Sequence, residues 1–153
     1  MNFETLIIYG IMHIIHIVAY YYIPYLHIKA KWKMQHLSKL LIEYITDVSF
    51  ISVRPDWLKN PMTGKNLELD CYNDELSIAL EYNGKQHYKY TPRFHKSMEE
   101  FELQVYRDIL KKKLCNKNGV DLIIVPYTVQ KEEICSYILR KLYRIKEARQ
   151  NSI

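Results

Sequence analysis

The sequence predicts an α/β fold with a small mixed sheet flanked by helices, preceded by an N-terminal hydrophobic helix. Segments with helical spacing of apolar residues alternate with short apolar runs that are typical of strands. Residues 34–153 are long enough to enclose one hydrophobic core, and they show no internal repeat and no second globular domain. We therefore expect a hydrophobic N-terminal segment, residues 1–33, followed by one globular domain, residues 34–153.

The N-terminal segment is a candidate membrane anchor. Residues 5–28 contain no Asp, Glu, Lys or Arg and are rich in Ile and Tyr. About 20 mainly apolar residues can span a bilayer, and the lysines that follow favour a cytoplasmic domain after the span. His13, His16 and Pro24 argue against a span. The alternatives are a hydrophobic helix packed on another subunit, or an extension upstream of a translation start at Met34, which would leave a soluble protein.

The first elements of the globular domain follow from the spacing of apolar residues. An amphipathic helix is predicted over residues 35–46 and a strand near residues 49–53. Two further strands are predicted around Asp70 and Glu81, with a polar turn between them. The inward face of the first helix is predicted to comprise Leu37, Leu40, Leu41, Tyr44 and Ile45.

Two helices and a strand are predicted in the second half of the chain. Residues 97–118 form a helix that is apolar over about two thirds of its circumference, so we expect it to be largely buried. One of its apolar stripes comprises Met98, Phe101, Val105 and Ile109. The dipeptide ending in Gly119 stops this helix, and the continuously apolar residues 121–126 predict a strand buried on both faces. Residues 131–149 predict a C-terminal helix packed on the sheet, with a basic outer face.

The charge of the chain favours polyanionic partners. The formal net charge is +5 and the isoelectric point is near 9.0. Residues 85–96 mix Lys, Arg and His with aromatic residues and lack regular periodicity. Such a loop suits contacts to phosphates and stacking on bases, or it closes the site as an aromatic-rich surface loop. The basic face of the C-terminal helix has a plainer alternative as a solubilising surface.

Cysteine usage indicates a reducing, intracellular compartment. Cys71, Cys115 and Cys135 are an odd number, and no two of them form a C-x-x-C pair. This pattern argues against a structural zinc site and against a disulfide scaffold.

The strongest functional pattern lies in residues 67–88. Asp70 and Glu81 lie on two short apolar runs joined by a turn, so their carboxylates can converge, and His87 follows closely. Cleavage of a phosphodiester requires charge stabilisation and an activated water, and carboxylate-bound Mg²⁺ (or Mn²⁺) supplies both. Asp70 and Glu81 would be the metal ligands, and His87 would accept a proton from the attacking water. The alternative is an ordinary hairpin with its carboxylates exposed to solvent.

The predicted helix over residues 97–118 has one polar strip. Residues three and four apart share a face of a helix, so Gln104, Asp108 and Lys111 point the same way. Arg107 and Glu100 belong to the same strip. It is either part of a site or a solvated face with an Asp/Lys pair.

The order of these residues resembles the PD-(D/E)XK nuclease superfamily. The resemblance rests on LELDCY, then IALEYNGKQHY, then VYRDILKKKLCNKNGVDLIIVPY, within residues 37–127. It is strongest to the branch of very-short-patch-repair endonucleases and related homing-type nucleases, and similar sequences occur in large DNA viruses. It implies a restriction-endonuclease-like fold and a Mg²⁺-dependent DNA endonuclease.

The resemblance also implies roles for single residues. The strand aspartate and the second acid of the family correspond to Asp70 and Glu81, both metal ligands. The signature after the second acid corresponds to Asn83, Gly84, Gln86 and His87. The helix motif R-D-x-x-K corresponds to Arg107, Asp108 and Lys111, and Glu43 matches a first-helix glutamate that often assists the metal. Gln104 is a supporting residue because it shares their polar strip. Apart from the resemblance, the basic residues expected to contact nucleic acid are Lys85, Lys89, Arg93, Arg107 and Lys112.

The sequence departs from the family at one catalytic position. The usual lysine, two residues after the second acid, is replaced by Asn83, which can neither act as a base nor bear positive charge. In the repair-endonuclease branch a histidine takes over part of that role, which favours His87, while Lys85 and Lys111 are the other cationic candidates. Without a substitute, the domain would bind nucleic acid without cutting it. A membrane-associated structural protein is a third hypothesis, based on residues 5–28 alone.

Overall fold

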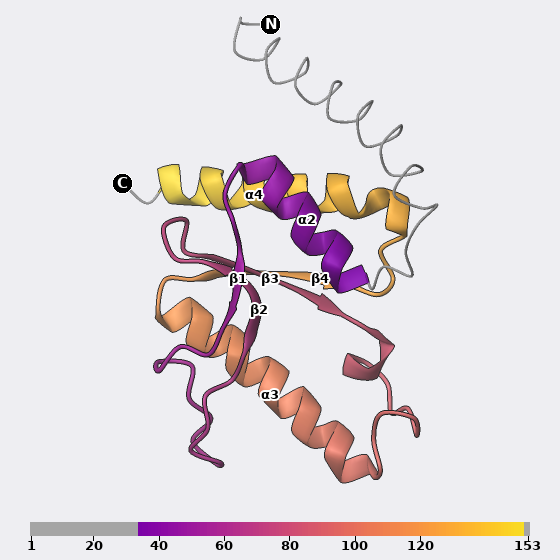
Figure 1. The fold of residues 1–153 in the computed structure, drawn as a ribbon. Helices are drawn as coiled ribbons and strands as arrows, with labels where there is room; N and C mark the ends of the chain where they lie inside the picture. Colours follow the sequence, from indigo (N-terminus) through magenta and orange to yellow (C-terminus); the bar gives the residue numbers. More distant parts are fainter. Residues whose placement is uncertain (1–33, 152–153) are drawn as a thin grey trace, which may run out of the picture. The chain divides into compact units, whose positions relative to one another are not determined.

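The computed structural model describes residues 34–151. Within them, four strands form one sheet in the order β1-β2-β3-β4 (Figure 1). The first three strands, β1 (Ile51–Val53), β2 (Leu69–Asn73) and β3 (Ile78–Asn83), pair antiparallel, and β4 (Asp121–Pro126) runs parallel to β3. The predicted α/β fold with a mixed sheet flanked by helices is therefore confirmed.

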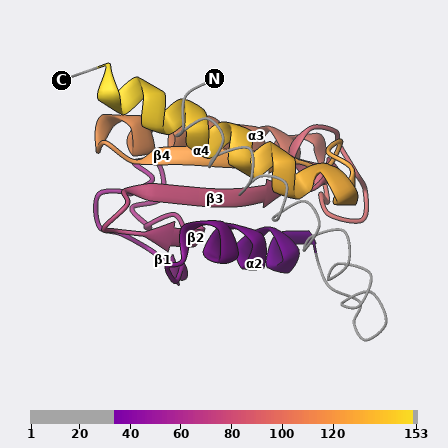
Figure 2. The same cartoon turned by 90° about the horizontal axis from the view of Figure 1, so that it is seen from above.

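The helices cover both faces of the sheet. α2 (Met34–Thr46) and α4 (Ile134–Gln150) lie on one face, and α3 (Met98–Lys117) lies on the other (Figures 1 and 2). Two short 3-10 helices, η1 (Lys85–His87) and η2 (Lys131–Glu133), follow β3 and precede α4. Because α3 belongs to the connection from β3 to β4, those two strands can run parallel.

The hairpin of β2 and β3 is fixed at its tip from two sides. Within the turn, the backbone N–H of Leu76 donates to Asn73 Oδ1 at 2.8 Å. The guanidinium of Arg149 donates to the carbonyls of Leu76 (2.9 Å) and Ser77 (3.2 Å) and pairs with Asp121 at 2.7 Å. The predicted basic outer face of the C-terminal helix thus includes a residue that ties α4 to the hairpin and supports its register.

The helix predicted over residues 35–46 buries a different face from the one expected. Leu37 and Leu41 are buried as predicted, but Ile42 is fully buried and Tyr44 is 58% exposed. The inward stripe is shifted by part of a turn, because both Ile42 and Ser38 pack inward in α2. The prediction for Tyr44 was wrong because the apolar spacing also fits a stripe through that residue.

α3 is less buried than its composition predicted. Ser97 caps its first turn by accepting a hydrogen bond from the N–H of Glu100. Along the whole helix, Cys115 is the one residue that is fully buried. Met98 is 55% exposed and Ile109 is 60% exposed. The helix forms the outer layer of the described part of the chain, so only its sheet-facing side is covered (Figure 1). The strand over residues 121–126 was predicted to be buried on both faces, and this was also wrong. β4 is an edge strand, and only Ile123 and Val125 of it are buried.

The predicted hydrophobic helix and candidate anchor over residues 5–28, and the alternatives for it, lie outside the described residues. Within residues 34–151, no helix has the length and apolar character that crossing a membrane requires.

Candidate active site

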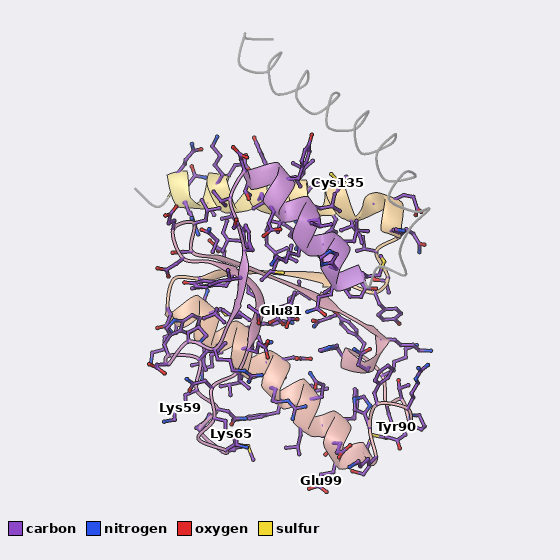
Figure 3. The ribbon with its side chains drawn as sticks, viewed as in Figure 1. Lys59, Lys65, Glu81, Tyr90, Glu99 and Cys135 are labelled. Atoms are coloured by element: carbon purple, nitrogen blue, oxygen red, sulfur yellow. The ribbon has the colours of Figure 1, made fainter. Side chains whose placement is uncertain are left out.

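Most of the predicted site residues line one cleft of about 250 Å³ on the face of the sheet that α3 covers. Figure 3 shows Glu81 in the space between the sheet and α3. β2, β3, η1 and α3 all contribute to this cleft, hereafter the carboxylate cleft. Its lining comprises Leu67, Glu68, Asp70, Glu81, Tyr82, Asn83, His87, Gln104, Arg107, Asp108 and Lys111.

The register of the hairpin places Asp70 beside Glu81. Cys71 pairs with Leu80 in the antiparallel ladder, so the next pair along the same register is Asp70 with Glu81. Directly opposed residues project from the same face of a sheet with their Cβ atoms about 5 Å apart. The two carboxylates therefore share the carboxylate cleft.

Burial makes these two carboxylates costly to ionise. Desolvation raises the pKa of Asp70, and the neighbouring charge of Glu68 adds to this rise. Desolvation likewise raises the pKa of Glu81, whose exposed fraction is 4%, in spite of the cation beside it. The site thus holds a buried acid, Glu81, and a partly buried acid, Asp70, and a positive charge would stabilise both.

Lys111 supplies one such charge from α3. Its Nζ lies 2.5 Å from Glu81 Oε1, and the side chains of Lys111 and Glu81 are 15% and 5% exposed. The family's lysine position, two residues after Glu81, holds Asn83 in this chain. Lys111 of α3 instead brings an ammonium group to Glu81. By contrast, Lys85 is exposed and does not line the cleft.

His87 is oriented by a chain of hydrogen bonds from α3. Its Nδ1 lies 2.8 Å from Asp108 Oδ2, and Gln104 Nε2 donates to Asp108 Oδ1 at 3.0 Å. Arg107 in turn donates to Gln104 Oε1 at 2.6 Å. Gln104 Nε2 also lies 3.2 Å from His87 Nδ1. In the tautomer in which Nδ1 donates to the carboxylate of Asp108, which can only accept, Nε2 is the ring nitrogen that can accept a proton. This is the tautomer that a general base requires.

Local backbone geometry brings His87 close to β3. The N–H of His87 donates to the carbonyl of Gly84 at 3.1 Å, which closes the turn of η1 immediately after the strand. A Cβ atom at Gly84 would lie 2.4 Å from Gln86 Oε1. Gly84 therefore leaves room for the Gln86 side chain to fold over the turn.

Several predicted residues do not join the carboxylate cleft. Glu43 is on α2, across the sheet from α3 (Figure 1), and its Oε1 accepts the N–H of Phe50 at 2.8 Å, so its carboxylate binds the segment after α2 and does not line the cleft. Gln86 lines a neighbouring cavity instead. The basic residues Lys85, Lys89, Arg93 and Lys112 are exposed outside the lining, whereas Arg107 belongs to it.

Sequence reasoning missed Glu68, which also lines the cleft. Its spacing of two residues from Asp70 places both on one face of an extended chain, and this could have indicated it. A hydrogen bond from Ser52 lowers the pKa of Glu68, and Arg54 pairs with the same carboxylate. Glu68 is therefore an ionised carboxylate that already has partners at the rim.

The Lys111–Glu81 pair should contribute measurably to stability. Lys111→Met is expected to lower the free energy of unfolding by about 3 kcal/mol, because it leaves a buried carboxylate without its cation. The double variant Lys111→Met/Glu81→Gln should recover most of that loss, because neither charge then remains. Urea unfolding of the wild type, both single variants and the double variant measures the coupling. Strictly additive effects of the two substitutions would show that the pair has no role in stability.

Comparison with known proteins finds relatives in viruses. The chain is 54% identical over 98 residues to the uncharacterized protein 307L of Invertebrate iridescent virus 6, a match that covers 61% of this chain and 49% of that protein. It is 46% identical over 95 residues to the uncharacterized protein 033L of Invertebrate iridescent virus 3, covering 62% of this chain and 49% of the relative. It is also 46% identical over 87 residues to the uncharacterized protein 094L of Frog virus 3, covering 56% of each chain.

The chain spans about half the length of the curated relatives it matches. These matches support the viral origin that the sequence predicted. No protein-family model matches the chain. No solved structure matches it either.

Proposed function

We propose that the protein is a divalent-metal-dependent DNA endonuclease. The observation that supports this most directly is the union, in one cleft, of the adjacent acids Asp70 and Glu81 with the His87–Asp108 pair. The first pair suits a hard cation and the second suits a proton acceptor. Hydrolysis of a phosphodiester needs both functions within reach of one phosphorus atom.

The donor set fits Mg²⁺, or Mn²⁺ in its place. Among residues 34–151, no three His, Cys, Asp or Glu side chains gather as a metal-binding group, so Asp70 and Glu81 would act as a pair. Mg²⁺ is usually held by one or two carboxylates and keeps several waters, which suits this arrangement. Both acids have a pKa raised by burial, so a cation between them would offset their cost of ionisation. When bound, the ion would polarise the phosphate and supply an acidified water.

The residues of the chain then have distinct tasks. Nε2 of His87 accepts the proton of the attacking water, and Asp108 holds the ring and stabilises the imidazolium that forms. Gln104 and Arg107 keep Asp108 and His87 in place through their own hydrogen bonds. The ammonium of Lys111 lies beside Glu81, where it would stabilise negative charge that develops on the phosphate oxygens.

The resemblance to PD-(D/E)XK nucleases supports the same proposal, including a restriction-endonuclease-like fold and the very-short-patch-repair branch. Asp70, Glu81, His87, Asp108 and Lys111 all line the carboxylate cleft. The net charge of +5 and the exposed residues Lys85, Lys89, Arg93 and Lys112 would favour DNA as the substrate.

One observation favours a second function, a DNA-binding module without nuclease activity. Asn83 stands in the position of the family's lysine, and it is buried, with an exposed fraction of 5%. We rank this function second because Lys111 brings an ammonium to Glu81. Separately, the free and buried Cys71, Cys115 and Cys135 support a reducing, intracellular compartment for the protein.

Metal removal should abolish the activity. We expect the full chain to nick supercoiled plasmid DNA with Mg²⁺ or Mn²⁺ and to leave it intact with EDTA, because the two carboxylates alone cannot activate water or stabilise the phosphorane-like charge. Gel electrophoresis of the plasmid reports the cleavage. Ca²⁺ serves as the control for metal binding without cleavage, since it binds the same oxygen ligands as Mg²⁺ but with a looser geometry. Binding of DNA without cleavage under every divalent metal would instead support the binding module.

A further inference from the structure

A second cavity, of about 420 Å³, adjoins the carboxylate cleft. It lies between the loop over residues 88–97 and the first half of α3, in the region where Figure 3 labels Tyr90 and Glu99. Three residues, His87, Gln104 and Arg107, line both spaces. A ligand in this side cavity would therefore touch the same side chains as a phosphate in the carboxylate cleft.

His95 gives the side cavity a buried polar group. Its ring is 5% exposed and packs between Tyr90 and Phe101, with ring centroids 5.9 and 5.3 Å away. The backbone N–H of Thr91 donates to His95 Nδ1 at 3.2 Å. A backbone N–H is only a donor, so Nδ1 accepts and Nε2 carries the remaining proton.

The Nε2–H of His95 has no hydrogen-bond partner among the described residues. A buried donor without a partner is costly, and the large majority of such groups are satisfied in proteins. His95 lines the side cavity, so an acceptor atom of a ligand there would supply the partner. This points to a ligand with in-plane acceptors and not to an aliphatic one.

Of the other residues that line the side cavity, Gln86 and Glu100 are polar, and Phe94 and Leu103 offer apolar surface to a flat aromatic ligand. Phe94 is 59% exposed and Leu103 is 39% exposed, although both are large apolar residues. The guanidinium of Arg93 lies 5.9 Å from the centroid of the Phe94 ring. An exposed aromatic face next to a cation is how proteins bind unpaired bases of nucleic acid. The volume also falls in the usual range for small-ligand sites, about 300–1,000 Å³.

We propose that the side cavity binds an unpaired nucleobase of the DNA strand whose phosphate occupies the carboxylate cleft. The base stacks on Phe94 and Leu103, and one of its ring nitrogens or carbonyl oxygens accepts from His95 Nε2. A base in an intact duplex is stacked and paired, so it enters only after leaving the helix. The preferred substrate is then DNA with an unpaired nucleotide next to the cut. This inference rests on the proposed function.

The test uses the full chain and a duplex containing one unpaired 2-aminopurine, compared with the same duplex fully paired. In Ca²⁺, we expect about tenfold tighter binding of the unpaired form, the scale of one base stacked on an aromatic side chain. Fluorescence of 2-aminopurine should also change on binding, because its stacking partner changes. Equal affinity for both duplexes would overturn the proposal.

Two variants of exposed lining residues examine the cavity itself. Phe94→Ala removes the stacking face and Leu103→Trp fills the space, and each is expected to reduce the tenfold preference to about twofold or less. Ile109→Ala is the matched control, because Ile109 is an exposed apolar residue of α3 that lines neither space. An undiminished preference in both Phe94→Ala and Leu103→Trp would also overturn the proposal.

Cleavage assays in Mg²⁺ separate this inference from the proposed function. Equal cleavage of paired and unpaired duplexes by the wild type would overturn the base site and leave the nuclease intact. A preference for the unpaired base that is lost in Leu103→Trp, without cleavage of any DNA, would support the base site and overturn the nuclease. His95→Phe keeps the packed ring but lacks the N–H, and it should bind the unpaired duplex more weakly than wild type while melting cooperatively.

Discussion

Asp70→Asn is expected to abolish DNA cleavage and, at the same time, to make the folded protein more resistant to urea at neutral pH. Asparagine has no negative charge, so a divalent cation at this site would lose one of the two carboxylates that would hold it. Loss of several kcal/mol of transition-state stabilisation corresponds to a decrease in rate of about a thousandfold or more. Plasmid nicking measures the loss of cleavage, and isothermal titration with Mg²⁺ measures the loss of metal binding.

The gain in stability follows from the pKa of Asp70. Burial raises the pKa of this carboxyl group above its usual value of 3.8, so the folded state binds the proton more tightly than the unfolded state. The stability contributed by the protonated group is fully present below that usual value and is lost as the pH rises through the raised pKa. At pH 7 the wild type therefore bears the cost of a buried charge that Asp70→Asn lacks.

Glu68→Gln provides the control for this argument. A hydrogen bond from Ser52 lowers the pKa of Glu68, so its ionised form stabilises the folded protein at neutral pH. Urea unfolding at pH 4.5 and pH 7 should therefore show a gain at pH 7 for Asp70→Asn and no gain for Glu68→Gln. An Asp70→Asn variant that is less stable than wild type at pH 7 would mean that Asp70 is stabilised as an anion, contrary to its burial.

His87→Ala is expected to lower the cleavage rate about 10²–10⁴-fold, the usual loss when a general base is removed. Binding of metal and DNA should persist, because His87 is neither of the proposed ligands and contributes no charge in its neutral form. Single-turnover cleavage at saturating protein isolates the chemical step. Lys85→Ala is the control from the same 3-10 helix: Lys85 is a proposed DNA contact outside the cleft, so its loss should weaken DNA binding but leave the single-turnover rate at saturating protein unchanged.

Two outcomes would reassign the proton acceptor. Full activity of His87→Ala would transfer the role to Lys111, whose ammonium lies beside Glu81. Equal losses in His87→Ala and Lys85→Ala would indicate that η1 acts through its position as a whole and not through the imidazole. A large loss in Asp108→Asn together with His87→Ala would support the paired arrangement, because an amide no longer fixes the ring tautomer.

The sequence predicted the local geometry of the site better than its surroundings. A short polar turn between two apolar runs defines a hairpin register, so the neighbouring positions of Asp70 and Glu81 follow from local chain geometry. The helical strip of Gln104, Asp108 and Lys111 follows from spacing in the same way. Which side of a helix is covered depends on the number of layers in the fold, and this is why Ile109 and Tyr44 were assigned wrongly.

The side cavity was beyond the reach of pattern analysis. Residues 88–97 have no periodicity, so nothing in the sequence indicates that His95 is buried while Phe94 is exposed. Glu43 was assigned by resemblance alone, and its distance from the cleft depends on which face of the sheet α2 covers. Both features arise from tertiary packing, which local spacing does not encode.

The separation of the site residues along the chain has a consequence for folding kinetics. Asp70 and Glu81 belong to a single hairpin, which can close within microseconds because its contacts are local. Lys111 and Glu81 are 30 residues apart, and their contact requires α3 to dock. We therefore expect the two acids to meet before their cation arrives, because the Lys111 contact joins residues that are far apart in the sequence. We expect substitutions of Lys111 to accelerate unfolding far more than they slow folding, so that this ion pair sets the lifetime of the native state.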